Sequence, residues 1–282
     1  MKKYFGNKLF SDAYLGINVV KSDGLGLFRY SDDTLAFIAA VEGGGDTLTT
    51  TEKAAVNKLV GELKIAGIWT TMDCLYPFVG GTSTSMRWNL RDVATNQITW
   101  YGGMVFGPQG IDGNRVNSGG NTGFSPSTAG YTEIAFGGFY TVMTNPTIQA
   151  TGWYDMGAYD AVTTKDNMLS YGWLQPSTTY VNLGSSYVTQ LAVPYGKSTV
   201  FVQNDGSTTQ MYQNNTLQNN GAQTLELSTQ TYGIGCSWRG SVYSPTARGF
   251  GTAFIASQSY NTAERTALNN AFINFNTTLS RA

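Results

Sequence analysis

The sequence contains no histidine, and this absence excludes more functions than any other feature of its composition. Imidazole activates the nucleophile in Ser-His-Asp and Cys-His sites, ligates catalytic zinc, and is the usual acid or base near neutral pH. Most familiar enzyme mechanisms are therefore excluded. Charged residues are also scarce, at 12% of the chain, and the formal net charge is −1. No basic field is available to hold a nucleic acid.

Cysteine and long apolar runs are scarce as well. The separation of the two cysteines, Cys74 and Cys236, fits neither a zinc knuckle nor the dense framework of a small secreted domain, so we expect buried thiols rather than a disulfide. Residues 1–10 lack the apolar stretch of a signal peptide, and the longest apolar run, Leu35–Val41, is too short to span a membrane. We expect a soluble protein made in a reducing cytoplasm, with no membrane partner.

The composition that remains is typical of a folded, β-rich chain, with 34 glycines, 41% hydrophobic residues and 13% aromatic residues. Residues 1–45 contain two Tyr-x-Gly units spaced ten residues apart, at Tyr4 and Gly6 and at Tyr14 and Gly16. Such units are too small to bury a core alone. We expect residues 1–45 to be an arm that orders against another protein, with a flexible arm and chance similarity as the alternative. A glycine linker then leads to one domain, residues 46–282.

Two segments carry the signals of capped amphipathic helices. Thr49 and Glu52 have the spacing of a capping box, and Val56, Leu59, Val60 and Leu63 follow at helical spacing. Asn261 and Glu264 repeat the cap before a second apolar stripe that ends near Leu279. The spacing predicts helices over Thr51–Ala66 and Thr262–Leu279, both docked on a core.

Between these helices, apolar and aromatic runs alternate with turn residues at intervals typical of a sandwich or barrel. Asn204-Asp205-Gly206 is a strong hairpin signal, and no alternation of strands with helices appears. We predict strands over Met72–Val79, Ile98–Phe106, Thr132–Val142, Ile148–Met156, Asn167–Leu174, Thr179–Leu183, Val188–Val193, Thr199–Gln203, Thr208–Gln213, Gln223–Leu227, Tyr232–Trp238 and Gly249–Ala256.

Several motifs occur in the order found in bacteriophage virion structural proteins that end in a concanavalin A-like lectin/glucanase domain. The resemblance rests on YPFVGGT at 76–82 with WNLRD at 88–92, NTGFSP at 121–126, a hairpin from Asp205-Gly206 to Tyr212–Asn215, and GFGTAFIA at 249–256 followed by NTAER at 261–265. It departs from the family pattern at Asn215. The Tyr-x-Gly units resemble short repeats of phage tail and head appendages.

This resemblance covers residues 46–282 and implies a mainly β, concanavalin A-like jelly-roll sandwich with two peripheral helices. It also implies a place in the virion, as a head fibre, a capsid decoration or a tail-fibre subunit, without deciding among these. The implied partners are other virion proteins, held through residues 1–45. A homotrimer is typical of fibres, although no heptad pattern demands one.

The sequence gives no sign of catalysis. The glucanase branch of the family uses a Glu-x-Asp-x-x-Glu strand, which is missing here. Asp155 and Asp160 would point to opposite faces of a regular strand unless Gly157 forms a bulge, and Glu133 has no second acid nearby. We expect no catalytic residue, and we expect the protein not to be an enzyme.

Phosphate and metal binding receive no better support. Residues 196–198 (GKS) look like the end of a phosphate loop but precede a predicted strand rather than a helix, so a β-turn is favoured. The acids are scattered and form no ladder for a metal, which leaves room only for one or two Ca²⁺ ligands on loops. We expect neither a metal nor another cofactor.

Aromatic side chains are the abundant functional resource, because flat rings suit both sugars and protein partners. Core packing is the default interpretation for most of them. We predict ligand binding at Trp153, Asp155, Trp173, Trp238 and Arg239. Two functions stay open. One is a structural virion protein that displays a lectin-like sandwich, and the other is a receptor-binding module for a host cell-surface glycan. Clustered aromatics on a water-facing loop would favour recognition.

Overall fold

The computed structural model describes residues 17–21, 27–141, 154–162, 165–174, 178–184, 188–189, 196–246 and 248–282. The arm residues Tyr4, Gly6, Tyr14 and Gly16, and most of the strand predicted over Ile148–Met156, lie outside these ranges. The first described strands, β1 (Ile17–Lys21) and β2 (Leu27–Ser31), pair with each other antiparallel in a small sheet of their own.

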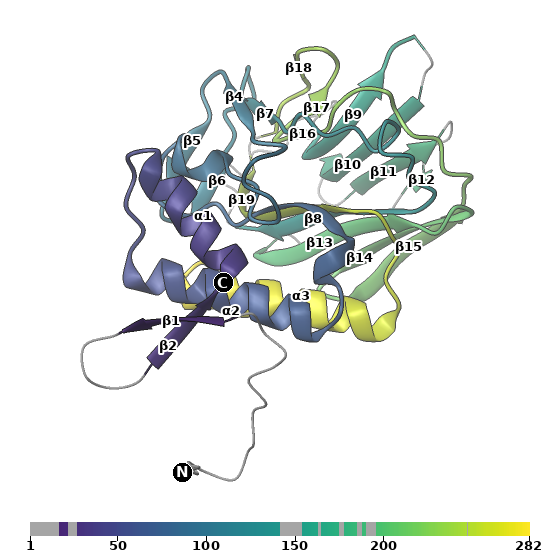
Figure 1. Cartoon of the computed structure of the whole chain (residues 1–282). Coiled ribbons are helices and arrows are strands. Elements are labelled where there is room, and N and C mark those ends of the chain that lie inside the picture. Colours follow the sequence, from purple (N-terminus) through teal and green to yellow (C-terminus); the bar gives the residue numbers. More distant parts are fainter. Residues whose placement is uncertain are drawn as a thin grey trace.

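Within the described residues, the other strands form a nine-stranded and an eight-stranded sheet that lie face to face (Figure 1). The first has the order β12 (Val188–Thr189), β11 (Thr178–Gly184), β10 (Lys165–Leu174), β9 (Met156–Asp160), β16 (Gly233–Ile234), β7 (Gly119–Asn121) and β4 (Thr99–Tyr101), with β17 (Ser237–Trp238) beside β9 and β18 (Val242–Tyr243) beside β17. The second has the order β15 (Thr216–Ala222), β14 (Thr208–Gln213), β13 (Ser198–Asn204), β8 (Ile134–Tyr140), β19 (Gly249–Ala256), β6 (Gly110–Asp112) and β5 (Val105–Gly107), with β3 (Met72–Tyr76) beside β19. The predicted jelly-roll-like sandwich is confirmed.

Three α-helices of the described residues complete the fold: α1 (Asp32–Gly43), α2 (Thr50–Ile65) and α3 (Thr262–Thr278). Both predicted capping boxes form; at α2 the Thr49 hydroxyl accepts from the Glu52 N–H at 3.2 Å, and the Glu52 carboxylate accepts from the Thr49 N–H at 2.8 Å. In the part of the chain described, no helix has the length and apolarity that crossing a bilayer requires. The helices α2 and α3 cover the eight-stranded sheet on the side away from the other sheet (Figure 1).

The strand alternation divides the interior into two cores. On β13, Phe201 faces the helices, while Val200 and Val202 face the other sheet. On β19, Phe254 likewise faces the helices and Ile255 the other sheet. Because successive strand residues point to opposite faces, one apolar strand can serve both layers. The central strands β8, β13 and β19 of the eight-stranded sheet are therefore buried on both sides, whereas its edge strand β15 is largely exposed.

Several segments differ from the sequence prediction. The strand predicted over Tyr232–Trp238 is two short strands, β16 and β17, separated by a turn at Gly235, where φ is +73°. α1 was not predicted, although Ser31 caps it and Phe37 and Val41 are buried in the core that it shares with α2. These residues lie within the predicted arm, whose boundary at residue 45 stays a prediction. The strand predicted over Ile98–Phe106 is two strands in different sheets, because the chain turns at Gly102, where φ is +63° and a side chain would meet the backbone oxygen of Asn117.

The strand predicted over Gln223–Leu227 is wrong, because the partner of β14 begins earlier. Asn214 and Asn215 have φ values of +46° and +61°, the left-handed pair that a two-residue hairpin turn needs. The chain therefore reverses at once, and Gln213 pairs with Thr216. β15 then occupies Thr216–Ala222, upstream of the predicted segment.

Both cysteines are buried free thiols, as the sequence predicted. Burial raises the pKa of Cys74, on β3, to about 12. Burial likewise raises the pKa of Cys236, which lies between β16 and β17, to about 12. Since the thiolate is the reactive form, both groups are protonated and inert at neutral pH.

Candidate functional site

A short hairpin over the outer face of the nine-stranded sheet builds the candidate site. Its strands β17 and β18 pair through Trp238 and Val242, and Arg239 N–H donates to the Ser241 carbonyl at 3.0 Å across the turn. Trp238 also pairs with Ala158 of β9, so the hairpin lies next to Tyr159. In Figure 1 this hairpin is at the end of the molecule opposite α2 and α3.

Five aromatic residues gather around this hairpin, and we call them the aromatic patch: Tyr101, Tyr154, Tyr159, Trp238 and Tyr243. Three of them stack in a row. The ring of Tyr243 lies 5.6 Å from that of Tyr159 at an interplanar angle of 15°, and 6.3 Å from that of Tyr154 at 19°. Tyr243 is 38% exposed, whereas Tyr154 is buried. The exposed ring of Tyr243 therefore lies between the buried ring of Tyr154 and the half-buried ring of Tyr159.

A second pair extends the aromatic patch toward β4. Tyr101 and Trp238 have ring centroids 5.0 Å apart, and Tyr101 is 41% exposed. Large exposed rings on one surface are unusual unless they serve a contact, because they favour association. Sequence reasoning asked for clustered aromatics on a water-facing loop, whereas the two exposed rings of the patch, Tyr101 and Tyr243, lie on the strands β4 and β18.

The cation of the aromatic patch is Arg239. Its guanidinium carbon lies 4.8 Å from the ring centroid of Tyr159 and 5.6 Å from that of Tyr243. Arg239 is exposed and takes part in none of the ion pairs formed by the described residues. The patch thus offers flat apolar faces and charged hydrogen-bond donors side by side, with no acid to neutralise them.

A buried ion pair beneath the aromatic patch holds the hairpin in place. Arg248 Nη1 donates to Asp155 Oδ2 at 2.8 Å, and the Thr246 hydroxyl donates to Asp155 Oδ1 at 2.6 Å. The Asp155 carbonyl also accepts from Gly235 N–H at 2.8 Å, just before β17. Gly235 precedes the hairpin, and Thr246 and Arg248 follow it. These bonds therefore tie both ends of the hairpin to Asp155, which directly precedes β9.

The predicted ligand-binding residues fall into three groups. Trp238 and Arg239 belong to the aromatic patch, where Arg239 is exposed but Trp238 is buried, at 7% exposure. Asp155 lies under it, is 1% exposed and has both carboxylate oxygens bound by protein donors, so we assign it a positioning role. Trp153 lies outside the described residues, and Trp173 lies on β10 with its side chain outside the described part.

Sequence reasoning missed the role of Tyr101. The available signal was the alternation of Thr99, Trp100 and Tyr101 on a short strand, which sends the two rings to opposite faces. Trp100 is accordingly half-buried against the sandwich core, and Tyr101 is exposed.

The acid pair considered for catalysis is divided between different partners. Asp160 ends β9 and accepts from the Thr229 hydroxyl at 2.7 Å, whereas Asp155 binds Arg248 and Thr246. Glu133 accepts from the Ser259 N–H and hydroxyl at 2.9 and 2.8 Å. These carboxylates support local structure. Among the described residues, no cluster of three acids or cysteines is placed to hold a metal.

Neither the protein-family models nor the curated proteins gave a match to the sequence, but the fold is similar to solved structures. The sialidase of Trypanosoma rangeli, solved with 2,3-difluorosialic acid, matches 77% of this chain and 38% of its own at 11% identity and a TM-score of 0.55. A structure of botulinum neurotoxin type C, from work on its cell entry through two ganglioside molecules, matches 74% of this chain and 53% of its own at 10% identity and a TM-score of 0.51. Domain 4 of an extracellular arabinanase from Geobacillus stearothermophilus, solved with arabinotriose, matches 71% of this chain and 98% of its own at 12% identity and a TM-score of 0.48.

The sialidase and neurotoxin likenesses and the strand order define the fold. The chain has a lectin-like β-sandwich, similar to part of each of these two structures. At such low identities the likeness concerns the fold alone, and function has to be argued from the site.

Proposed function

We propose that this protein is a virion protein of a bacteriophage that displays a lectin-like sandwich and binds a host surface glycan through the aromatic patch. The observation that carries the glycan part is the exposure of two rings of the aromatic patch, Tyr101 on β4 at 41% and Tyr243 on the β17–β18 hairpin at 38%. Exposed ring faces pack against the C–H faces of sugar rings, and Arg239 supplies donors for hydroxyl groups.

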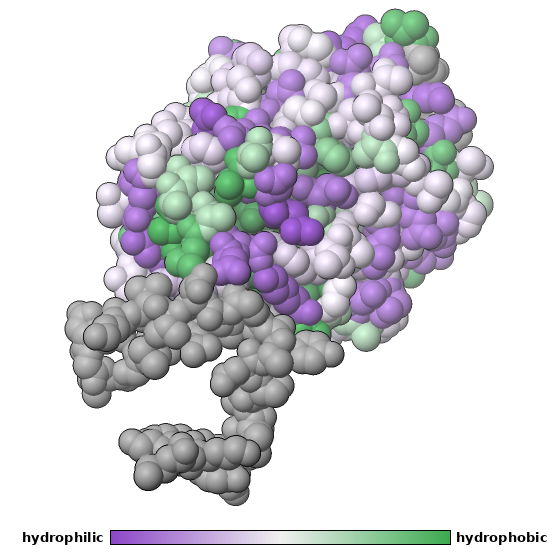
Figure 2. Space-filling model, viewed as in Figure 1, coloured by the Kyte–Doolittle hydropathy of each residue, from purple (hydrophilic) through white to green (hydrophobic). Residues whose placement is uncertain are grey.

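The virion part rests on the order of sequence motifs from residue 76 to residue 265 and on the N-terminal segment. Residues 1–45 are proposed to attach the protein to another virion protein. The helix α1 supports this. On its surface Ala36 and Ala39 are exposed and Leu35 is half-buried, and α1 carries no charged residue between Thr34 and Val41. Figure 2 shows apolar residues gathered over the part of the surface where Figure 1 draws α1.

The glycan proposal predicts a loss of affinity when Tyr243, the exposed ring of the tyrosine row, is removed. An oligosaccharide array identifies a bound glycan, which is then titrated calorimetrically against the wild type and Tyr243→Ala. We expect the affinity to fall roughly tenfold or more, because an exposed aromatic anchor is the type of residue that dominates recognition surfaces. Arg239→Ala should weaken binding in the same direction.

Leu217→Ala is the matched control, because Leu217 is also a large exposed side chain, 45% exposed, but lies on β15 of the other sheet. Its affinity should equal that of the wild type. Equal affinities for Tyr243→Ala and Leu217→Ala would contradict the proposal. The glycan should also be recovered intact after incubation, because we propose that the protein binds without cleaving.

The attachment proposal predicts that deletion of residues 1–26, which removes both Tyr-x-Gly units, leaves a folded domain that enters particles in smaller amounts. α1 is retained in this deletion because Phe37 and Val41 are buried in the core. The unfolding midpoint and the glycan affinity should stay near those of the full chain. Incorporation is measured by quantifying the protein in purified particles, and undiminished incorporation would count against the arm.

A further inference from the structure

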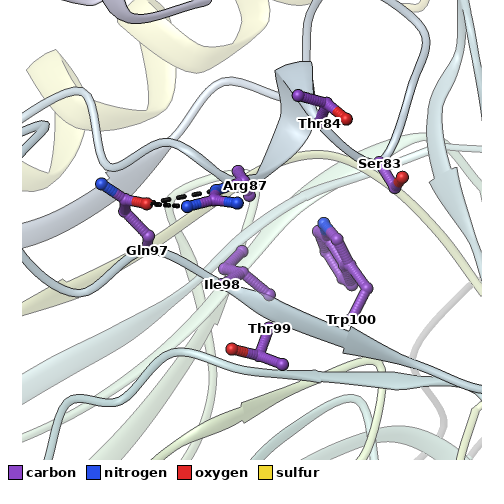
Figure 3. A pocket seen from close by; sticks show the side chains of 7 residues that line it. All are labelled: Ser83, Thr84, Arg87, Gln97, Ile98, Thr99 and Trp100. Carbon is purple, nitrogen blue, oxygen red and sulfur yellow. Dashed lines mark hydrogen bonds between the residues drawn. The ribbon is translucent and has the colours of Figure 1, made fainter. Parts of the chain in front are cut away.

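A pocket of about 470 Å³ opens beside β4 and is lined by Ser83, Thr84, Arg87 and residues 97–100. Arg87 ends the short helix η2 (Ser85–Arg87), and Thr99 and Trp100 lie on β4. Figure 3 shows the Arg87–Gln97 pair at one side of the pocket and the indole of Trp100 at the other, with Ser83 and Thr84 above and Ile98 and Thr99 below. Neither the predicted ligand residues nor the aromatic patch includes these side chains.

Arg87 is fixed in one position before any ligand arrives. Its Nε donates to Gln97 Oε1 at 3.1 Å, and its Nη2 donates to the same oxygen. The guanidinium carbon also lies 5.0 Å from the ring centroid of Trp88. Gln97 is oriented in turn, because its Nε2 donates to the Val93 carbonyl at 2.8 Å. A donor group held in this way loses little conformational freedom on binding.

The charge of Arg87 is not neutralised by the protein. Its hydrogen-bond partner is a neutral amide, and none of the ion pairs among the described residues involves it. Two of its nitrogens face Gln97, and Figure 3 shows the remaining end of the guanidinium directed toward the pocket. Guanidinium groups bind planar anions, carboxylates above all, through charge-assisted hydrogen bonds. This side of the pocket therefore favours an anionic group.

The opposite side suits a ring that carries hydroxyl groups. Trp100 is held by edge and tilted contacts with Phe106 and Phe78, at centroid distances of 5.2 and 6.1 Å. Its indole Nε1–H is buried and meets no acceptor among the described residues. Buried donors are normally paired, so an unpaired one beside a pocket is unusual. The exposed Ser83 and Thr84 add hydroxyl groups at the rim.

We propose that this pocket binds a sugar unit that carries a carboxylate, of the hexuronate class, with the carboxylate on Arg87 and the ring against Trp100. The aromatic patch carries no part of this argument, so the two sites can fail separately. On β4, Trp100 serves the pocket while its neighbour Tyr101 serves the patch. An acidic polysaccharide could then occupy both sites of one molecule.

The test is a titration of the full chain with sodium glucuronate, followed by the shifts of backbone amides in residues 83–100. Glucose has the ring without the carboxylate, and acetate has the carboxylate without the ring. We expect saturable binding of glucuronate, with glucose and acetate at least about tenfold weaker because each lacks one of the two contacts. If acetate bound as tightly as glucuronate, the pocket would be a plain anion site and the proposal would be overturned. The absence of saturable glucuronate binding would overturn it as well.

Gln97→Glu is the decisive variant. It keeps the contact between residues 87 and 97 but gives Arg87 a carboxylate partner within the protein. Glucuronate affinity should therefore fall about tenfold or more. Arg87→Gln, which removes the charge, is the second variant and should have the same effect; the unfolding midpoint of each shows that the fold is kept. Arg91→Ala is the matched control, since Arg91 also stacks on an indole, 5.1 Å from that of Trp69, but does not line the pocket. Unchanged affinity in folded Gln97→Glu or Arg87→Gln would contradict the proposal, whereas Tyr243→Ala should leave glucuronate binding unchanged.

Discussion

Replacing Arg281 by alanine is expected to lower the free energy of unfolding by about 3–5 kcal/mol. The side chain is 1% exposed, and its guanidinium donates to carbonyls of three separate segments. Nε donates to Pro108 at 2.7 Å, Nη2 to Phe78 at 2.8 Å, and Nη1 to Gly251 at 3.1 Å and Pro77 at 3.3 Å. Removing it would leave these buried carbonyls without a strong donor.

The expected loss is large because Arg281 also holds a strained turn. Phe78 has a φ of +43°, which is unfavourable for a bulky residue, and its carbonyl is one of those that Arg281 binds. Burial lowers the pKa of Arg281 to about 10, so the group keeps its charge at neutral pH. The bonds to the turn are therefore charge-assisted.

Urea unfolding of Arg281→Ala and Lys58→Ala measures this effect. Lys58 is the control cation, because its side chain is 53% exposed and lies 3.7 Å from Glu62 on the surface of α2. Its removal should cost less than about 0.5 kcal/mol, as is usual for exposed pairs on a helix. If Arg281→Ala lowered the free energy of unfolding no more than Lys58→Ala does, the role assigned to the four carbonyl contacts would be refuted.

Asp155→Ala is expected to cost about 3–5 kcal/mol as well, because it leaves Arg248 buried without its carboxylate. Arg248 is 6% exposed and donates to Asp155 at 2.8 Å. The same change removes the acceptor of the Thr246 hydroxyl, so the hairpin that bears Tyr243 should also loosen. Glycan affinity should therefore fall together with stability.

A double-mutant cycle separates this positioning role from direct ligand contact. Combining Asp155→Ala with Arg248→Met removes both charges, and the double variant should lose about 2 kcal/mol less than the sum of the single losses. Glycan binding should recover in part in the same variant. Additive losses, or binding that is abolished in a fully stable Asp155→Asn, would show that Asp155 contacts the ligand instead.

Local signals predicted the elements that depend on a few neighbouring residues. The boxes at Thr49 and Asn261 located α2 and α3, and Asp205-Gly206 located the turn between β13 and β14. α1 was missed because its run from Leu35 to Val41 is apolar on all sides, which hides the helical period.

The candidate site could be predicted only in part, because exposure depends on tertiary packing. Trp238 and Arg239 were identified as aromatic and cationic residues near a turn. The stacking of Tyr243 on Tyr159 depends on β17 lying parallel to β9, which no local pattern encodes. The same holds for Arg281, whose partners come from segments far away in sequence.

The central claim, that the aromatic patch binds a glycan, is tested most directly by fluorine NMR of protein labelled with 5-fluorotryptophan. The chain has 6 tryptophans, of which Trp238 lies in the patch, Trp100 in the pocket and Trp69 in the core between helices and sheet. On titration with a neutral oligosaccharide selected from the array, we expect the Trp238 resonance to shift in a saturable way while those of Trp69 and Trp100 stay in place. An unchanged Trp238 resonance at saturating oligosaccharide would contradict the account.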